Sequence, residues 1–266
     1  MKRQRISPVW WARSLRRWLT GYAPSDQARL IHRDRDLAVA WLPGTTKRLV
    51  LVFISISHKS LHPDRLEFRA NASDNGKNHV LFINDRWWSW YSRPGLRDRI
   101  AELVRKVIAA RGIESVWSIG NSMGGYGAIL FRDRLPISKV VAFVPQILLR
   151  DEVIDRPTWA ANRHRIMPEV ERDLTPIMAA KATEFDLVYG DSDEDDQIQL
   201  GHLRQCLPDA SHVRIVIVPG QKHNVARWLK AQGQLAGLTA ALWNGDRPAL
   251  EDISQRLETP LDLALA

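Results

Sequence analysis

Short apolar runs rich in β-branched residues alternate along the chain with segments of helical spacing. Leu49 to Ile54 and His79 to Ile83 have the pattern of strands buried on both faces of a sheet. Leu96 to Ala110 places its apolar residues on one helical face, and Gly112 follows as a stop signal. Further strands are predicted at 37–42, 116–120, 139–144, 185–189 and 213–218, and further helices from Ser122 to about 134 and from about 224 to 243.

Alternating strands and helices predict a mostly parallel sheet covered on both sides. In such sheets the chemistry lies beyond the carboxyl ends of the strands. Three polar features fall at predicted strand ends: Ser122, the acidic run 191–196, and His223. We therefore expect these three features to converge in the folded protein.

The serine lies in the sequence Gly120-Asn121-Ser122-Met123-Gly124. Gly-x-Ser-x-Gly is typical of a sharp strand-to-helix turn that exposes a serine hydroxyl, and glycine avoids a Cβ clash at so tight a bend. The following helix points its N–H groups and positive dipole end at any oxyanion formed there. The pattern arises by chance in about one chain in ten of this length, so its interpretation depends on the strand before it and the helix after it. Motifs for a phosphate-binding P-loop or a dinucleotide are absent from this turn.

A serine hydroxyl needs a neighbouring base, and imidazole needs a carboxylate that fixes its tautomer. His223 follows the strand 213–218 at a strand-to-helix turn, and the order serine, acid, histidine is that of this class of site. Of the acidic run, Asp193 is the predicted partner, because it comes third after Gly190. The remaining candidates are Asp191, then Asp195 and Asp196.

Composition limits the other functions. The 266 residues suit one large α/β domain, and the apolar (45%) and charged (26%) fractions are ordinary. A single cysteine, Cys206, excludes an internal disulfide framework and suits a reducing compartment, so we predict a cytoplasmic protein. His58 and His62 have the spacing of one helix face but have no evident third ligand, so a metal site is not expected. The serine and histidine chemistry predicted above needs no cofactor, so none is expected.

Part of the net charge of +8 lies at the N-terminus, where residues 1–18 contain basic residues and tryptophans but no acid. One interpretation is a surface helix whose tryptophans pack on the domain. The other is that residues 1–21 contact an anionic membrane surface, on the inner face of the membrane, or an acidic partner. Nucleic-acid binding is not expected, because the remaining basic residues are scattered and no recognition motif is present.

Three motifs together resemble a known family: Gly120 to Gly125, Gly190-Asp191-Ser192-Asp193, and Gly220-Gln221-Lys222-His223. Over 37–243 the chain is similar to esterase-like serine hydrolases of the α/β-hydrolase fold. The segments Phe82 to Asp85 with Trp90-Tyr91, Ser122 to Tyr126, and Phe143 to Gln146 are in addition similar to bacterial hydrolases associated with polysaccharide and glycoprotein export.

This resemblance implies a mostly parallel central sheet flanked by helices, with a short cap insertion at about 151–181 after the sixth strand. It divides the chain into a basic, Trp-rich segment (1–25), the hydrolase domain (26–245) and a tail (246–266). It also implies an oxyanion hole formed by the N–H groups of Met123 and of Ile56. The chain has Ser55-Ile56 where many lipases have His-Gly.

Aromatic residues follow the strand that ends at Asn84-Asp85. They either cap the sheet as part of the core or line a pocket for an acyl chain or a sugar. For the second case the predicted substrate-binding residues are Trp88, Trp90 and Tyr91, beside Trp87.

These features predict a serine hydrolase that cleaves a carboxylic ester of a small molecule or a carbohydrate through an acyl-enzyme, with a carbohydrate O-acyl ester as the most specific expectation. The alternatives are an acyltransferase or thioesterase with the same three residues, or an inactive binding or assembly protein on this fold.

Overall fold

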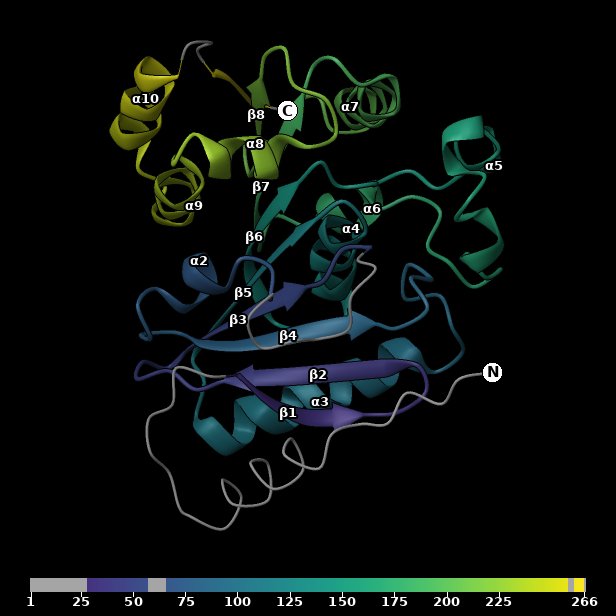
Figure 1. Cartoon of the computed structure of the whole chain (residues 1–266), viewed down its shortest axis with the longest axis vertical. Helices are drawn as coiled ribbons and strands as arrows, with labels where there is room; N and C mark the ends of the chain where they lie inside the picture. Colours follow the sequence, from purple (N-terminus) through teal and green to yellow (C-terminus); the bar gives the residue numbers. More distant parts are fainter. Residues whose placement is uncertain (1–27, 57–65, 258–260, 266) are drawn as a thin grey trace, which may run out of the picture.

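The computed structural model describes residues 28–56, 66–257 and 261–265. Within them, nine strands form one sheet in the order β1-β2-β4-β3-β5-β6-β7-β8-β9 (Figure 1). Strands β3 to β8 run parallel, whereas β1, β2 and β9 pair antiparallel to their neighbours. The strands are β1 (Arg29–Arg33), β2 (Leu37–Leu42), β3 (Arg48–Phe53), β4 (His79–Asp85), β5 (Ser115–Asn121), β6 (Ile137–Phe143), β7 (Glu184–Gly190), β8 (Val213–Val218) and β9 (Asp262–Leu265).

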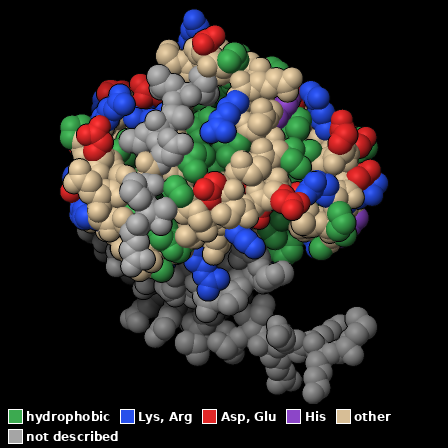
Figure 2. All heavy atoms as spheres, turned by 90° about the horizontal axis from the view of Figure 1, so that it is seen from above, with side chains coloured by type: hydrophobic (Ala, Val, Ile, Leu, Met, Phe, Trp, Pro, Cys, Tyr) green, Lys and Arg blue, Asp and Glu red, His purple; other side chains and the backbone are tan. Residues whose placement is uncertain are grey.

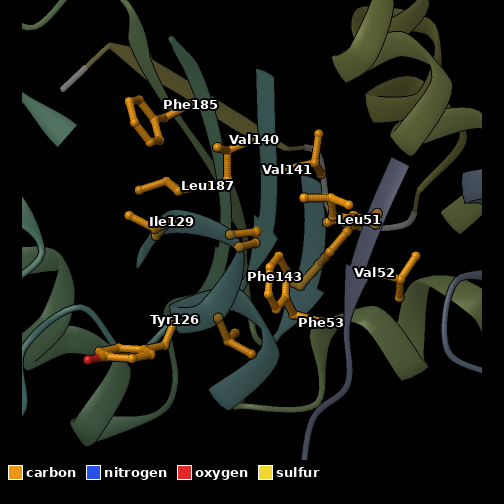
Figure 3. Packing of buried hydrophobic residues seen from close by; sticks show 14 of the residues in the cluster. Leu51, Val52, Phe53, Tyr126, Ile129, Val140, Val141, Phe143, Phe185 and Leu187 are labelled. Atoms are coloured by element: carbon orange, nitrogen blue, oxygen red, sulfur yellow. The ribbon is translucent and has the colours of Figure 1, made fainter. Parts of the chain in front are cut away.

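The central strands are buried because their apolar side chains meet helices on both faces. Leu51 and Phe53 of β3 and Val141 of β6 are fully buried, as the continuous apolar runs predict (Figure 3). Phe53 stacks on Phe131 with ring centroids 5.0 Å apart. The predicted mostly parallel sheet with helices on both sides is confirmed.

Helices α2 and α9 contact each other and cover one face over β3 and β6, whereas α4 packs on β3, β5 and β6. Helix α3 ends at Gly112, whose φ of 57° and N–H bond to the carbonyl of Ala109 form a left-handed cap. The helices are α2 (Arg69–Ser73), α3 (Leu96–Arg111), α4 (Met123–Leu130), α5 (Asp151–Ile154), α6 (Thr175–Met178), α7 (Glu194–Cys206), α8 (Val225–Ala231), α9 (Leu235–Asn244) and α10 (Arg247–Arg256), with single 3₁₀ turns η2 (Phe131–Asp133), η3 (Pro157–Trp159) and η4 (Arg163–Arg165).

The segment between β6 and β7 contains only short helices: α5, η3, η4 and α6. Two backbone hydrogen bonds connect its ends, from Leu149 to Arg172 and from Leu174 to Ile147, both 2.9 Å long. It therefore forms a small, closed insertion at the position where the sequence predicts a cap.

Several elements differ from the sequence prediction. The single helix predicted over 224–243 is two helices, because Gly233 adopts a φ of 69° between α8 and α9. Strand β1 and helix α7 were not predicted: β1 is short and mostly exposed, and the first turn of α7 is acidic. The weak amphipathic pattern after residue 246 corresponds to a packed helix, α10, whose Leu250 and Ile253 are buried.

Charged side chains of both signs are interspersed over the face in Figure 2. No helix in the described part of the chain is long and apolar enough to cross a membrane. The predicted N-terminal segment (1–25), with its membrane or acidic-partner contact, and the pair His58 and His62 lie outside the described residues. Among the residues that are described, no group of three or more His, Cys, Asp or Glu is arranged to hold a metal ion.

Candidate active site

Ser122 occupies a sharp turn between β5 and α4. Its φ of 53° and ψ of −119° lie outside the regions that a non-glycine residue ordinarily adopts, at a cost of about 1–3 kcal/mol. The turn is held because the Ser122 N–H donates to the carbonyl of Phe143, 2.9 Å away at the end of β6, and the Ser122 carbonyl accepts from Tyr126 N–H at 3.0 Å. The strained backbone therefore presents the hydroxyl at the carboxyl end of the sheet.

The glycines on either side of Ser122 are required by close backbone contacts. A Cβ on Gly120 would lie 2.1 Å from the carbonyl oxygen of Gly124, and a Cβ on Gly124 would lie 2.1 Å from that of Phe53. Neither contact can be relieved by rotating a side chain, because both partners are backbone atoms. The steric role that the sequence predicts for these glycines agrees with this geometry.

Two hydrogen bonds connect three distant side chains into a chain of donors and acceptors. His223 Nε2 lies 2.8 Å from Ser122 Oγ, and His223 Nδ1 lies 2.8 Å from Asp196 Oδ1. The Asp196 side chain is 2% exposed, whereas that of His223 is 37% exposed. A carboxylate on Nδ1 keeps the proton there, so Nε2 is free to accept the proton of the serine hydroxyl.

The sequence prediction of the acid was wrong: Asp196, not Asp193, contacts His223. Asp193 is the N-cap of α7, and its Oδ1 accepts from the N–H groups of Asp195 and Asp196 at 3.1 and 3.2 Å. A capping carboxylate is committed to the helix backbone, and the residue three positions later turns inward toward His223. The signal that could have indicated this was an aspartate immediately before a helix-forming run.

The other acidic candidates have structural contacts. Asp191 Oδ1 accepts from the Gly220 N–H at 2.6 Å, which connects the loops after β7 and β8. A second bond, from Ser192 N–H to the Gln221 carbonyl at 3.0 Å, connects the same loops. Asp195 instead forms an ion pair with Arg156 of the insertion, with Nε and Oδ1 2.5 Å apart.

Burial and charge oppose each other at His223. Burial lowers the pKa of His223, but the hydrogen bond and charge of Asp196, together with the charges of Asp193 and Asp195, outweigh it, so that the pKa is raised above its ordinary value. Burial also raises the pKa of Asp196, against the hydrogen bond and charge of His223. The site therefore stabilises a protonated imidazole, which is the state that forms when histidine accepts a proton from serine.

The two predicted oxyanion donors lie on elements that meet beside Ser122. Met123 is the first residue of α4, so its N–H has no acceptor within the helix. Ile56 lies three residues beyond β3, whose last residue, Phe53, contacts Gly124 as described above. Ile56 is half-buried and packs against the core.

The structure places Trp90 and Tyr91 in the core, in contrast to their predicted role in substrate binding. Both are fully buried. Trp90 Nε1 donates to Gln146 Oε1 at 2.8 Å, and Tyr91 packs edge-on against Phe53 with ring centroids 5.6 Å apart. The alternative interpretation, in which these aromatics cap the sheet, therefore describes this pair.

The other two aromatics of the loop retain some exposure. Trp88 is half-buried, and the guanidinium of Arg165 in the insertion lies 4.8 Å from the centre of its ring. Trp87 is 39% exposed. A depression of about 530 Å³ adjoins His223, and its lining consists of Asp193, Gly220, Gln221, Lys222, His223 and Asn224.

Neither a model of a known protein family nor a curated protein sequence matches the chain. Solved structures do match it. Esterase 2 of Thermogutta terrifontis, phosphonylated by sarin, superposes with a TM-score of 0.61 at 14% identity, over 87% of this chain and 96% of that one. The chain has the α/β-hydrolase fold. This confirms the fold that the sequence motifs imply.

Two further solved structures are similar to the chain. The capsule O-acetyltransferase of Neisseria meningitidis serogroup A matches with a TM-score of 0.55 at 13% identity, over 77% of this chain and 92% of that one. A glycosylation-associated protein of the Gap123 complex from Streptococcus agalactiae matches with a TM-score of 0.60 at 18% identity, over 78% of this chain. The matched region is 46% of that Streptococcus chain.

Proposed function

We propose that the protein is a serine hydrolase that cleaves a carboxylic ester through an acyl-enzyme intermediate. The observation that supports this most directly is the pair of 2.8 Å contacts that connect Asp196, His223 and Ser122. A hydroxyl hydrogen-bonded to an imidazole, which in turn bonds a buried carboxylate, is the arrangement that activates serine as a nucleophile.

In the proposed reaction, Ser122 Oγ attacks the ester carbonyl carbon while its proton passes to His223 Nε2. The tetrahedral intermediate then collapses, the bond to the leaving oxygen breaks, and His223 returns the proton to the departing alcohol. Water attacks the acyl-enzyme with the same help from His223, which releases the acid and restores the serine. Asp196 keeps the imidazole oriented and stabilises its positive charge throughout.

The negative charge on the carbonyl oxygen requires donors that are in place before the reaction. We assign this role to the N–H groups of Met123 and Ile56, because the first opens a helix beside Ser122 and the second follows a strand in contact with that helix. Removing one such donor typically slows an enzyme by about 10²–10³-fold.

For the substrate we propose a small-molecule or carbohydrate ester, with a carbohydrate O-acyl ester as the most specific case. Structural similarity to a capsule O-acetyltransferase and to a glycosylation-associated protein supports a carbohydrate substrate. Of the aromatic residues in the loop after β4, Trp88 and the exposed Trp87 keep surface with which to contact it, whereas Trp90 and Tyr91 are buried.

The second candidate function is acyl transfer, in which an alcohol replaces water in the second half of the reaction. It is supported by similarity to the same O-acetyltransferase, which has also been solved in complex with CoA. The two functions differ in what accepts the acyl group from Ser122. Acetyl-CoA consumption that depends on an added carbohydrate, with an O-acetylated product, would favour transfer; release of acetate at the same rate without it would favour hydrolysis.

The first experiment is labelling with a fluorophosphonate probe, followed by peptide mapping, alongside hydrolysis of p-nitrophenyl acetate. We expect the label on Ser122, and we expect Ser122→Ala to lose both labelling and hydrolysis while keeping the wild-type melting temperature. A protein that neither labels nor hydrolyses short acyl esters would instead be a binding or assembly protein on this fold.

A further inference from the structure

The segment that leaves β3 enters the site directly beside Ser122. The close contact between Gly124 and the Phe53 carbonyl places the end of β3 against the first turn of α4. The Ile54 N–H continues the sheet for one more residue, with a bond to the Ile83 carbonyl at 3.0 Å. Ser55 and Ile56 therefore emerge from the sheet next to the turn that carries the nucleophile.

Ser55 is held at this point by a carboxylate that the proposed reaction does not itself use. The Ser55 N–H donates to Glu67 Oε2 at 3.1 Å, and the Ser55 hydroxyl donates to Glu67 Oε1. Both oxygens of Glu67 thus bind one residue, and burial raises the pKa of this carboxyl against those two bonds. Because the Ser55 N–H already donates to Glu67, the next backbone donor of this segment is the N–H of Ile56.

Glu67 is itself positioned by the strand that anchors Ser122. Its neighbour Phe68 has a φ of 51° and stacks on Phe143, with ring centroids 5.3 Å apart and planes inclined by 20°. The carbonyl of that same Phe143 accepts the N–H of Ser122. The backbone that carries Glu67 and the turn that carries Ser122 therefore both contact Phe143 of β6.

We propose that Glu67 is a positioning residue: by clamping Ser55 through two hydrogen bonds, it holds the N–H of Ile56 where the oxyanion forms. The inference rests on the proposed function, because it assigns a role within that reaction. The hydrogen bonds of the Glu67 carboxylate go to Ser55, whereas Ser122 and His223 bond to each other and to Asp196. Its effect reaches the reaction only through the backbone of Ser55 and Ile56.

The test compares Glu67→Ala, Glu67→Gln and Ser55→Ala, with Glu102→Gln on the exposed face of α3 as a control that removes the same charge away from the site. For each purified variant, kcat and KM for p-nitrophenyl acetate, the rate of fluorophosphonate labelling and the melting temperature are measured. Glutamine can still accept from the Ser55 N–H through Oε1 and donate to its hydroxyl, so it is the conservative variant.

We expect Glu67→Ala to lower kcat and the labelling rate by about 10²–10³-fold, the typical effect of losing one oxyanion donor, with little change in KM. Glu67→Gln should recover most of that loss, Ser55→Ala should fall between them because it keeps the backbone bond, and Glu102→Gln should match the wild type.

If the wild type is active and the kcat of Glu67→Ala lies within about threefold of the wild-type kcat, the positioning role is overturned and the proposed function stands. If Glu67→Ala does not fold, Glu67→Gln and Ser55→Ala decide. A loss of kcat that is proportional to the loss of melting temperature in these two variants would show that Glu67 stabilises the fold and does not position Ile56. A wild-type protein that neither labels at Ser122 nor turns over esters would overturn both the function and this role.

Discussion

Replacing Asp196 by asparagine tests which carboxylate supports His223. The substitution keeps the side-chain volume and removes only the charge that now lies 2.8 Å from His223 Nδ1. An amide can donate its own proton to Nδ1, which leaves the imidazole in the tautomer that cannot accept from serine. We expect kcat for p-nitrophenyl acetate to fall by about 10³–10⁴-fold, which corresponds to about 4–5.5 kcal/mol of transition-state stabilisation.

The fold should tolerate this change. Burial raises the pKa of Asp196, so the charged carboxylate is disfavoured where it lies, and its side chain is only 2% exposed. A neutral amide of similar shape removes that burial cost. We therefore expect a melting temperature at or above that of the wild type, measured by circular dichroism or calorimetry.

Asp193→Asn is the matched control, because asparagine also caps helices well and leaves the charge of Asp196 in place. We expect its kcat to stay within about tenfold of the wild type, an allowance for the loss of one nearby charge. Full activity in Asp196→Asn, or a larger loss in Asp193→Asn than in Asp196→Asn, would refute the assignment of the acid from the structure.

Three further outcomes are expected. Because the pKa of His223 is raised and its neutral form is the base, kcat/KM should rise with pH through a midpoint above the ordinary histidine value of about 6.5. Asp195→Asn should move that midpoint to lower pH, because it removes a negative charge that raises the pKa of His223. A midpoint that does not move would exclude the charge of Asp195 as a cause of the raised pKa. Gly124→Ala would force a Cβ to within 2.1 Å of the Phe53 carbonyl, so we expect about 1–3 kcal/mol of destabilisation in urea unfolding together with a large loss of activity. Trp90→Ala should cost about 3–5 kcal/mol of unfolding free energy, as for a buried aromatic; an unchanged stability with a higher KM would restore its predicted role in binding.

The central sheet and two of the three site residues could be predicted from the sequence. Continuous apolar runs such as Leu49 to Ile54 indicate buried parallel strands, and the turn around Ser122 has a steric requirement that fixes its glycines. His223 was found because a polar residue at the end of a strong strand faces the same edge of the sheet.

The acid could not be identified by counting from Gly190, because the choice depends on where α7 begins. Once Asp193 is engaged as the N-cap, the helix geometry directs Asp196 inward; the sequence offers several carboxylates, and only the position of the first turn separates them. The orientation of the aromatic residues after β4 could not be predicted for a different reason. Whether Trp90 points into the core or into a pocket is decided by tertiary contacts such as its bond to Gln146, which periodicity does not encode.

The hydrogen bonds from Gly220 to Asp191 and from Ser192 to Gln221 have a consequence for how the protein responds to substitution. They join the turn after β8, which leads to His223, to the turn after β7, which leads into the helix that contains Asp196, so a displacement of one turn is transmitted to the other. Disturbing either turn shifts the same pair of groups. Paired substitutions across the two turns should therefore be non-additive, with a coupling on the order of 0.5–3 kcal/mol in a double-mutant cycle.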